Sequence, residues 1–163
     1  MPTRYSEPEG LTAVAEFHRT FRLPVLHTPQ LPSADRCRLR LNLLQEELDE
    51  LRQAIADDDL VEVADALADL QYVLSGAIHE FGLGSRFANL FAEVHRSNMS
   101  KTCATAEEAE ATLAHYRTLG QAGRVEASEG AFLVYRTDDN KVLKNVNYSP
   151  ADVVGQLGGP HAG

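Results

Sequence analysis

Acidic side chains between residues 46 and 69 are the part of this sequence best suited to chemistry. They form two groups whose members recur at spacings of three and four residues: Glu46, Glu47 and Glu50, then Glu62, Asp65 and Asp69. Such spacing places the members of each group on one side of a helix. Two like charges about 4 Å apart repel by ~4 kcal/mol at an effective dielectric of ~20. Six carboxylates at this range therefore indicate that a bound cation or protons neutralise them.

The alternative interpretation is an ordinary solvated helix face, which is the commonest role of acidic residues at helical spacing. The acidic run 57–59 fits that role, because carboxylates at the start of a helix cap its free N–H groups and complement its dipole. The two acidic groups fit it poorly, because Arg52 is the only basic residue between Glu46 and Asp69. Solvated helix faces normally mix charges of both signs. We therefore favour a metal site.

The oxygen ligands favour one class of metal ion. Carboxylate-only sites suit Mg²⁺, Mn²⁺ or Ca²⁺, whereas zinc and iron normally recruit His or Cys. A di-iron bundle would place His three residues after Glu62, where this sequence has Asp65. Mg²⁺ is commonly shared between a few carboxylates and the phosphates of a substrate. We therefore expect Mg²⁺ as the cofactor, with Mn²⁺ as a substitute, and a ligand that carries phosphates.

Two predicted helices position the acidic groups. Apolar residues recur at spacings of three and four in the runs before and after residues 57–59, which is the period of an amphipathic helix. So short a polar connection makes the two helices antiparallel neighbours. Residues equally distant from the connection then come level, so we expect Glu50 to face Asp65 and Glu46 to face Asp69.

The two acidic groups resemble a known signature. Glu-Glu-x-x-Glu from residue 46 and Glu-x-x-Asp from residue 62 are similar to the EExxE…ExxD pattern of the all-α nucleoside triphosphate pyrophosphohydrolases. That superfamily includes MazG, the dimeric dUTPases, the dCTPases and phosphoribosyl-ATP pyrophosphohydrolase. The resemblance covers roughly residues 11–101, and the short gap between the two groups looks like the compact MazG-type hairpin. Within the superfamily, the chain most resembles MazG-like proteins with dUTP-directed activity.

The resemblance implies an enzyme. The expected reaction is Mg²⁺-dependent hydrolysis of a nucleoside triphosphate, with dUTP as the leading substrate, to the monophosphate and pyrophosphate. The residues that match the family's metal ligands are Glu47, Glu50, Glu62 and Asp65. Glu46 lies beside these ligands but is free to turn, so it is the candidate base that deprotonates the attacking water.

Other functions remain open at this point. Within the family, the alternatives are a dCTP-directed or broad-specificity pyrophosphohydrolase and a phosphoribosyl-ATP pyrophosphohydrolase-like enzyme. A different class is a non-catalytic helical module that binds nucleotides or another protein, which would leave the carboxylates without a role. A Mg²⁺-dependent nucleotide sensor would use the same site without activating water. Release of pyrophosphate distinguishes the enzyme from both.

A base pocket is predicted one turn beyond the carboxylates, ~5 Å along the helix axis. Asn42 and Tyr72 come level there, and Asp69 continues the same side of the hairpin toward them. An amide can hydrogen-bond a base edge and a ring can stack on it. The alternative is that Asn42 and Tyr72 line a seam between the helices. Phe17 and His18 could reach the same pocket, although we favour Phe17 in the core and His18 in solvent.

Five further residues are candidate phosphate or nucleotide contacts. Asn98 and Lys101 follow the predicted fourth helix, where similar proteins place an Asn and a Lys against the nucleotide. The tail around Lys141, Lys144 and Tyr148 resembles a tail of MazG-like proteins, and its lysines would close over the phosphates. The alternative for Lys101 is an ordinary positive charge at a helix C-terminus.

Capping residues predict several helix boundaries. Ser33 is the expected N-cap of the long second helix, and Thr105 and Glu108 form a capping box that opens a fifth. Gly82 and Gly120 are expected to end the helices before them.

The predicted fold class is all-α: an antiparallel helix bundle of about five helices with a small C-terminal β-hairpin. The predicted strands are 132–136 and 141–146. We expect an all-α domain over residues 1–120, with residues 121–163 as the hairpin and a loose tail packed on it. Leu39, Leu41 and Leu43 lie off the main apolar stripe of the second helix. We therefore expect a homodimer that completes the bundle.

Composition excludes some partners. The net charge of −9 argues against nucleic acid, whose backbone is bound by clusters of Lys and Arg. No apolar run approaches the ~20 residues that cross a bilayer, and the first residues lack a signal-peptide core, so no membrane partner is expected. The two cysteines form no metal or redox motif, which is typical of a reducing cytoplasm.

Overall fold

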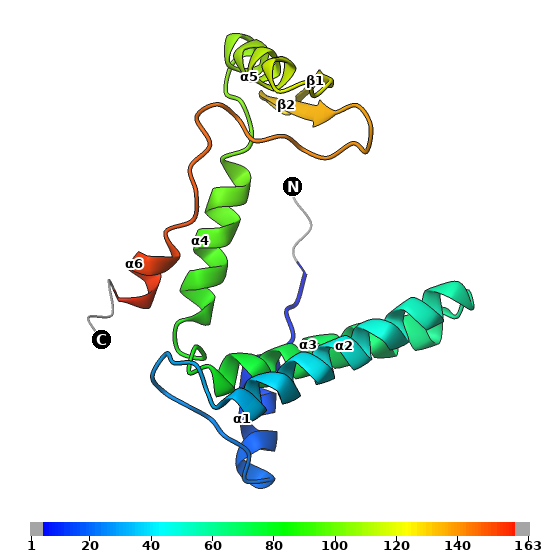
Figure 1. Cartoon of the computed structure of the whole chain (residues 1–163), viewed down its shortest axis with the longest axis vertical. Coiled ribbons are helices and arrows are strands. Elements are labelled where there is room, and N and C mark those ends of the chain that lie inside the picture. Colours follow the sequence, from blue (N-terminus) through cyan, green and yellow to red (C-terminus); the bar gives the residue numbers. More distant parts are fainter. Residues whose placement is uncertain (1–4, 159–163) are drawn as a thin grey trace. The chain divides into compact units, whose positions relative to one another are not determined.

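The computed structural model describes residues 5–158, which divide between Phe87 and Ala88 into two compact units. We call them the N-terminal unit and the C-terminal unit. The described residues form six helices and a two-stranded antiparallel sheet, which confirms the predicted mostly helical fold with a small C-terminal hairpin (Figure 1). The elements are α1 (Gly10–Thr20), α2 (Ala34–Ala56), α3 (Leu60–Glu80), α4 (Phe87–Met99), α5 (Ala106–Thr118), β1 (Gly123–Ser128), β2 (Ala131–Arg136) and α6 (Val153–Leu157). None of the described helices is both long and apolar enough to cross a membrane.

The long α2–α3 hairpin dominates the N-terminal unit and confirms the predicted antiparallel pair (Figure 1). Ser33 caps α2, because its side chain accepts a hydrogen bond from the backbone N–H of Arg36. Asp59 caps α3, because its carboxylate accepts from the backbone N–H groups of Val61 and Glu62 at 3.0 and 3.2 Å. These caps satisfy N–H groups that a helix leaves free in its first turn.

Helix α1 packs against α3 at the end of the hairpin away from the connection (Figure 1). Val14 and Ala15 of α1 are buried, as are Ala77 and Ile78 of α3. The fit requires a small residue at Gly76, where a Cβ atom would lie 2.7 Å from Nη1 of Arg40. The three helices therefore bring polar side chains of α2 close to the backbone of α3.

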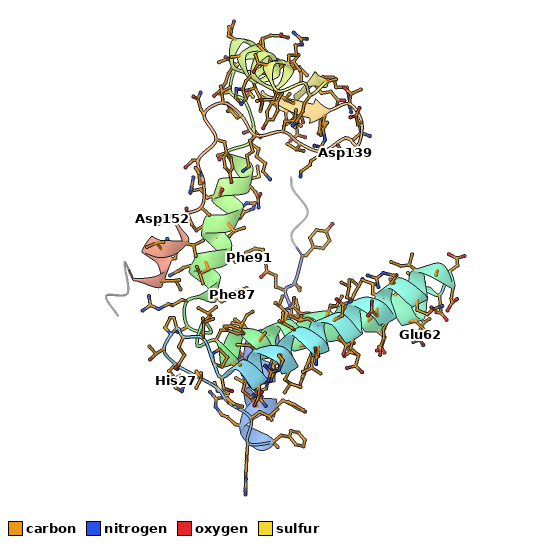
Figure 2. All side chains as sticks on the ribbon, in the orientation of Figure 1. His27, Glu62, Phe87, Phe91, Asp139 and Asp152 are labelled. Atoms are coloured by element: carbon orange, nitrogen blue, oxygen red, sulfur yellow. The ribbon has the colours of Figure 1, made fainter. Side chains whose placement is uncertain are left out.

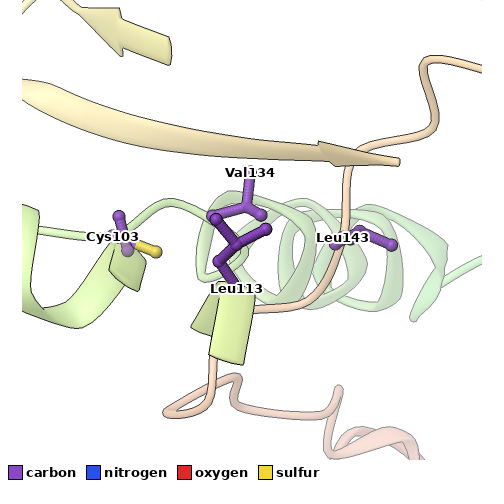
Figure 3. Packing of buried hydrophobic residues seen from close by; sticks show 5 residues of the cluster. Cys103, Leu113, Val134 and Leu143 are labelled. Atoms are coloured by element: carbon purple, nitrogen blue, oxygen red, sulfur yellow. The ribbon is translucent and has the colours of Figure 1, made fainter. Parts of the chain in front are cut away.

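In the C-terminal unit, α5 packs on the β1–β2 hairpin. The strands pair from Gly123 opposite Arg136 to Ser128 opposite Ala131. Glu129 and Gly130 make the turn with φ angles of 38° and 83°, as tight hairpin turns require. The buried cluster between helix and sheet consists of Cys103, Ala109, Leu113, Val134 and Leu143 (Figure 3).

One of the two predicted strands is wrong. Residues 131–136 are a strand, but their partner is 123–128 and not 141–146. Segment 141–146 follows β2 only briefly, through the backbone bonds Arg136 N–H to Lys141 O and Leu143 N–H to Val134 O. Its later polar groups turn to other partners instead. Asn145, for example, donates to the carbonyl oxygen of Thr102 and to the carboxylate of Glu108.

Candidate active site

Helices α1, α2 and α3 enclose a pocket of about 330 Å³ in the N-terminal unit, which we call the three-helix pocket. Much of its wall is apolar, and its polar side chains are two arginines, one histidine, one tyrosine and two carboxylates. Its lining is Val14, Phe17, His18 and Leu23 from α1 and the turn after it, Arg36, Leu39, Arg40, Leu43 and Glu47 from α2, and Asp69, Tyr72 and Val73 from α3. Such a concave, mainly apolar site with a few convergent polar groups is typical of small-molecule binding.

Aromatic rings form one wall of the three-helix pocket. The Tyr72 and Phe17 rings meet edge to face, with centroids 5.6 Å apart. Phe17 is 39% exposed and His18 is 2% exposed, so our preferred placement of these two side chains was wrong. The histidine can take the buried position because the carbonyl oxygen of Pro24 and the guanidinium group of Arg40 offer partners to its two ring nitrogens. Asn42 is exposed and does not line this pocket.

Two arginines on α2 converge on one buried carboxylate. Arg36 and Arg40, one helical turn apart, both donate hydrogen bonds to Glu80 of α3, whose side chain is fully buried. Burial alone would raise the pKa of Glu80, but the hydrogen bonds and charges of the two guanidinium groups outweigh it and hold the pKa below its ordinary value. Glu80 therefore stays ionised and fixes both arginines in the pocket wall.

His18 lies beside these arginines as a neutral ring. Its Nδ1 is 2.8 Å from the carbonyl oxygen of Pro24, to which it donates, and Nε2 is 3.3 Å from Nη2 of Arg40. Burial lowers the pKa of His18, and the charge of Arg40 lowers it further. A neutral ring leaves Nε2 as an acceptor for the guanidinium group.

Glu47 is the acidic residue most altered by its surroundings. It is partly buried, and its Oε2 atom is shielded from solvent without a hydrogen-bond partner. Burial raises the pKa of Glu47, and neighbouring carboxylates raise it further. Those neighbours are Asp69, Glu50, Glu46 and Asp65, in decreasing order of effect. The carboxylates of the two helices are thus close enough to repel one another, as the hairpin geometry predicts.

Glu50 and Glu62 line a second pocket, of about 410 Å³, with Asp57 and Asp59 beside them. This pocket lies at the closed end of the hairpin, and Figure 2 shows Glu62 near the point where α2 passes into α3. Its charged lining is entirely acidic. The two helices therefore carry carboxylates from the three-helix pocket toward the connection.

The carboxylates do not form a closed cage in the chain by itself. The side chains of Glu46 and Asp65 are exposed. Across residues 5–158, no three His, Cys, Asp or Glu side chains converge closely enough to hold a metal ion. The structure brings Glu47 and Asp69 together in one pocket wall, and it places the other predicted ligands along the same hairpin.

The remaining candidates belong to the C-terminal unit. Nζ of Lys101 donates to Oδ1 of Asn98 at 2.8 Å. Nζ of Lys144 lies 4.5 Å from the centre of the Tyr148 ring, a cation–π contact. Lys141 is exposed. The three lysines line a common pocket of about 320 Å³.

Sequence reasoning missed Arg36, Arg40 and Glu80, although a signal for them exists. The rule that sets Glu50 level with Asp65 also sets Arg36 level with the last turn of α3, where Glu80 lies. Applying that rule to basic as well as acidic residues would have found the ion pair.

Two comparisons with known proteins bear on this site. A family model described as phosphoribosyl-ATP pyrophosphohydrolase matches residues 14–98, which include most of α1 and all of α2 and α3. The chain is also 23% identical to "Uncharacterized protein L479" of Acanthamoeba polyphaga mimivirus, in an alignment covering 88% of this chain and 93% of the viral protein. The likeness to the viral protein therefore extends into the C-terminal unit.

The family match covers both acidic groups and every residue that lines the three-helix pocket. It also spans more than half of the chain. The resemblance to the all-α pyrophosphohydrolases is thereby confirmed at the level of the family: the chain belongs to the phosphoribosyl-ATP pyrophosphohydrolase family, in the MazG-like all-α group of pyrophosphohydrolases.

Proposed function

We propose that this pyrophosphohydrolase hydrolyses dUTP, with Mg²⁺, to dUMP and pyrophosphate. The observation that carries the proposal is a pair of unsatisfied atoms in the three-helix pocket. Among the described residues, Oε2 of Glu47 and Nε of Arg40 are the buried side-chain atoms without a hydrogen-bond partner, and both residues line this pocket. Such atoms are costly in a folded protein unless a ligand satisfies them. The pocket lining thus offers one unsatisfied acceptor and one unsatisfied donor, which a phosphate group with a bound cation would satisfy.

The oxygen ligands of the hairpin suit a divalent cation in type, but no three of them converge among residues 5–158 of the single chain, so they would have to draw together when the ion binds. A shielded carboxylate oxygen without a donor, in a set of ligands that offers only oxygen, favours Mg²⁺ or Mn²⁺. The side chains that would hold Mg²⁺ are Glu47, Glu50, Glu62 and Asp65. When bound, Mg²⁺ would orient the triphosphate and neutralise charge on its oxygens.

Glu46 serves as the base in this proposal. It accepts a proton from water while the water oxygen forms a bond to phosphorus. The P–O bond of the phosphoanhydride breaks, and pyrophosphate leaves with the bonding electrons. Glu46 is exposed next to the partly buried Glu47, so it can exchange the proton with solvent.

The three-helix pocket holds the nucleoside. The Phe17 and Tyr72 rings offer an apolar wall for a base, and Asp69 and Glu47 line the same pocket. Arg36 and Arg40 supply positive charge within the same pocket. Asn42 would need to approach from outside the present lining.

A substrate panel tests this assignment. The chain is incubated with dUTP, dCTP, dTTP or phosphoribosyl-ATP, with Mg²⁺ or EDTA, and pyrophosphate and orthophosphate are measured separately. We expect pyrophosphate from dUTP with Mg²⁺ and none with EDTA. Orthophosphate release, turnover in EDTA, or no turnover of any substrate would contradict the proposal.

Phosphoribosyl-ATP is a second candidate substrate, favoured by the description of the matching family. The same panel separates the candidates, because the preferred substrate has the highest kcat/KM. A higher kcat/KM for phosphoribosyl-ATP or dCTP than for dUTP would make that compound the assigned substrate in place of dUTP. The assignment of the chain as a pyrophosphohydrolase would stand.

The active form is a homodimer in this proposal. Leu41, Leu48 and Ile55 recur every seven residues on α2, and all three are exposed in the single chain. On α3, a second row with the same spacing, Leu60, Leu67 and Leu74, is also exposed. Rows with this period seat a partner helix, so a second hairpin would complete a four-helix bundle.

A further inference from the structure

Strand β1 of the C-terminal unit has one side without a neighbouring strand, which we call the β1 edge. Among the described residues the sheet has two strands, so β1 pairs only with β2. The outer side of β2 is covered by chain segments on either side of the hairpin. Phe132 exchanges both backbone hydrogen bonds with Cys103 at 2.8 Å. The carbonyl oxygen of Val134 accepts from the N–H of Leu143, also at 2.8 Å.

The register of the hairpin shows which backbone groups lie on the β1 edge. The N–H of Thr137 donates to the carbonyl oxygen of Ala122 at 3.0 Å, and these residues lie opposite one another where the β1–β2 register continues. Hydrogen-bonded pairs alternate along an antiparallel ladder. Every second residue of β1 from Arg124 therefore also directs its N–H and C=O groups to β2. The residues that direct these groups to the β1 edge are Gly123, Val125 and Ala127.

These outward N–H and C=O groups have no hydrogen-bond partner within the part of the chain that the structure describes. In the single chain they are left to water, since backbone polar groups are nearly always paired. An open strand edge of this kind is a template for pairing with another strand. The question is then which strand fits it.

The side chains of β1 carry opposite charges on one face of the sheet. Val125 packs against the buried cluster next to α5. Arg124 and Glu126 are exposed and project from the opposite face, because side chains alternate along a strand. The guanidinium group of Arg124 donates to Glu126 at 2.8 Å and lies 5.1 Å from the centre of the Tyr135 ring. The β1 edge therefore presents one positive and one negative charge, two residues apart.

We propose that the β1 edges of two copies of this chain pair antiparallel about Val125, so that two hairpins form one four-stranded sheet. With this centre, Arg124 of each copy lies opposite Glu126 of the other. Moving the centre by one residue sets Arg124 opposite its own counterpart, or Glu126 opposite its own counterpart. Opposite charges directly across a strand pair stabilise it, whereas like charges destabilise it. The charges thus select one register, which is self-complementary as a twofold interface requires.

The backbone and the helices also fit this register. Outward groups meet outward groups, because Val125 then faces Val125 and Gly123 faces Ala127. The twofold axis runs perpendicular to the joint sheet between the two copies of Val125, so the α5 helices of both copies lie on one face. The charged side chains of both copies lie together on the other face.

This contact is small and separate from the carboxylate hairpin. Strands of six residues bury far less area than a stable interface requires. We therefore expect it to be transient between free chains at micromolar concentration, where the measured mass reports the α2 and α3 rows instead. The inference concerns the C-terminal unit alone and stands whether or not the chain hydrolyses dUTP.

Disulfide trapping tests the register. Arg124→Cys and Glu126→Cys are made in separate full chains that also carry Cys37→Ser, and the two chains are mixed and oxidised. In the proposed register the two new thiols face each other in a non-hydrogen-bonded pair, whose Cα atoms lie ~4.5 Å apart, within disulfide range. The second ion pair of the interface stays intact. We expect at least ~10-fold more disulfide-linked dimer from the mixture than from either variant alone, because only the mixture brings two thiols into this geometry.

The matched control mixes Arg124→Cys with Ser128→Cys. Their thiols face each other only if the centre moves to residue 126, so this mixture should give no more dimer than either variant alone. Equal yields from the two mixtures, or no excess dimer from the first, would overturn the proposal. All three changed side chains are exposed, and circular dichroism checks that each variant is folded.

Charge variants provide a second measurement without new thiols. Arg124→Glu leaves only negative charges at residues 124 and 126, and Glu126→Arg leaves only positive ones. Hydrogen exchange at the backbone N–H of Val125 should slow when the two variants are mixed at high concentration, and not when either is concentrated alone. Equal exchange rates in the mixture and in the separate variants would contradict the pairing.

Discussion

Glu47 carries the strongest prediction at the scale of single residues. We expect Glu47→Gln to lower kcat/KM at least ~10²-fold, because even second-shell partners of metal ligands contribute 10- to 100-fold. In EDTA the same variant should be more stable than the parent, because it removes a carboxylate that four others repel. Thermal unfolding with and without Mg²⁺ measures both effects. Glu16→Gln, on the exposed face of α1, is the control and should behave like the parent.

Glu46 should behave differently from its neighbour. Loss of a general base typically costs ~10²- to 10⁴-fold in rate, so we expect Glu46→Gln to lower kcat by that order. Its affinity for Mg²⁺, measured by the stabilisation that Mg²⁺ gives against heat, should remain close to that of the parent. Normal turnover by this variant would show that another group takes the proton.

Glu80 makes a prediction about pH. Its folded pKa lies below the ordinary value of 4.5, so its ionisation stabilises the fold above about pH 4.5, and this contribution is lost as pH falls through the folded pKa. Glu80→Gln resembles the protonated side chain and leaves Arg40 buried without a counter-charge. We expect a loss of roughly 3–5 kcal/mol at pH 7, as for other broken buried pairs.

Urea unfolding of this variant at several pH values provides the measurement. The difference between the parent and Glu80→Gln should begin to shrink below about pH 4.5, where the unfolded parent takes up its proton, and should disappear once the pH falls below the folded pKa. Asp35→Asn removes an exposed partner of Arg38 and should cost less than ~1 kcal/mol. A constant difference across the pH range would mean that Glu80 does not act through its charge.

The sequence predicts the acidic residues of the site better than the pocket beside them. Carboxylates at helical spacing are visible because nothing nearby neutralises them, and the hairpin rule places them on facing helices. The burial of Glu80 is not visible, because a lone Glu at the end of an apolar helix is usually exposed. Its position depends on α1 closing one end of the hairpin, which helical periodicity does not specify.

At the scale of elements, Gly82 is required for the turn after α3. It has a φ of +68°, and a Cβ atom there would collide with the carbonyl oxygen of Thr28. Gly120 after α5 has a φ of +73° with open space around it. Gly120→Ala should therefore lower the free energy of unfolding by about 1–2 kcal/mol, the cost of a left-handed backbone for alanine. Gly82→Ala should lower it by roughly 2–4 kcal/mol, because overpacking against Thr28 adds to the same backbone cost. Chemical denaturation measures the free energy of unfolding of both variants. Equal losses would mean that Thr28 moves away and the added methyl group at residue 82 causes no overpacking.

Helix boundaries were predictable because a capping interaction depends only on residues close in sequence to the helix end. Thr105 caps α5 as expected, because its hydroxyl accepts from the N–H of Glu108, but the Glu108 carboxylate accepts from the N–H of Ala104, the residue before the cap, so the capping box is only half formed. The strand partner was not predictable in the same way. Segment 123–128 mixes charged and small residues and gives a weak strand signal, whereas segment 141–146 looks like a strand but uses its polar groups on α5. Tertiary contacts outweighed strand propensity there.

At the scale of the whole molecule, the exposed rows of α2 and α3 predict self-association. We expect light scattering at micromolar concentration to give about twice the chain mass of 17.9 kDa. Leu48→Glu with Leu67→Glu places charges in the middle of both rows and should give a folded monomer. Leu119→Glu changes an exposed leucine of the C-terminal unit and should leave the mass unchanged. A monomeric parent would contradict the dimer.

The distribution of lysine also determines how the molecule responds to reagents. No lysine precedes residue 101, so an amine-reactive dye or cross-linker has side-chain targets only in the C-terminal unit, all of them in one pocket. A lysine-specific protease likewise has no cleavage site within α1, α2 or α3. Chemistry at lysine side chains can therefore mark or block one half of this protein while the side chains of the acidic hairpin in the other half stay unmodified.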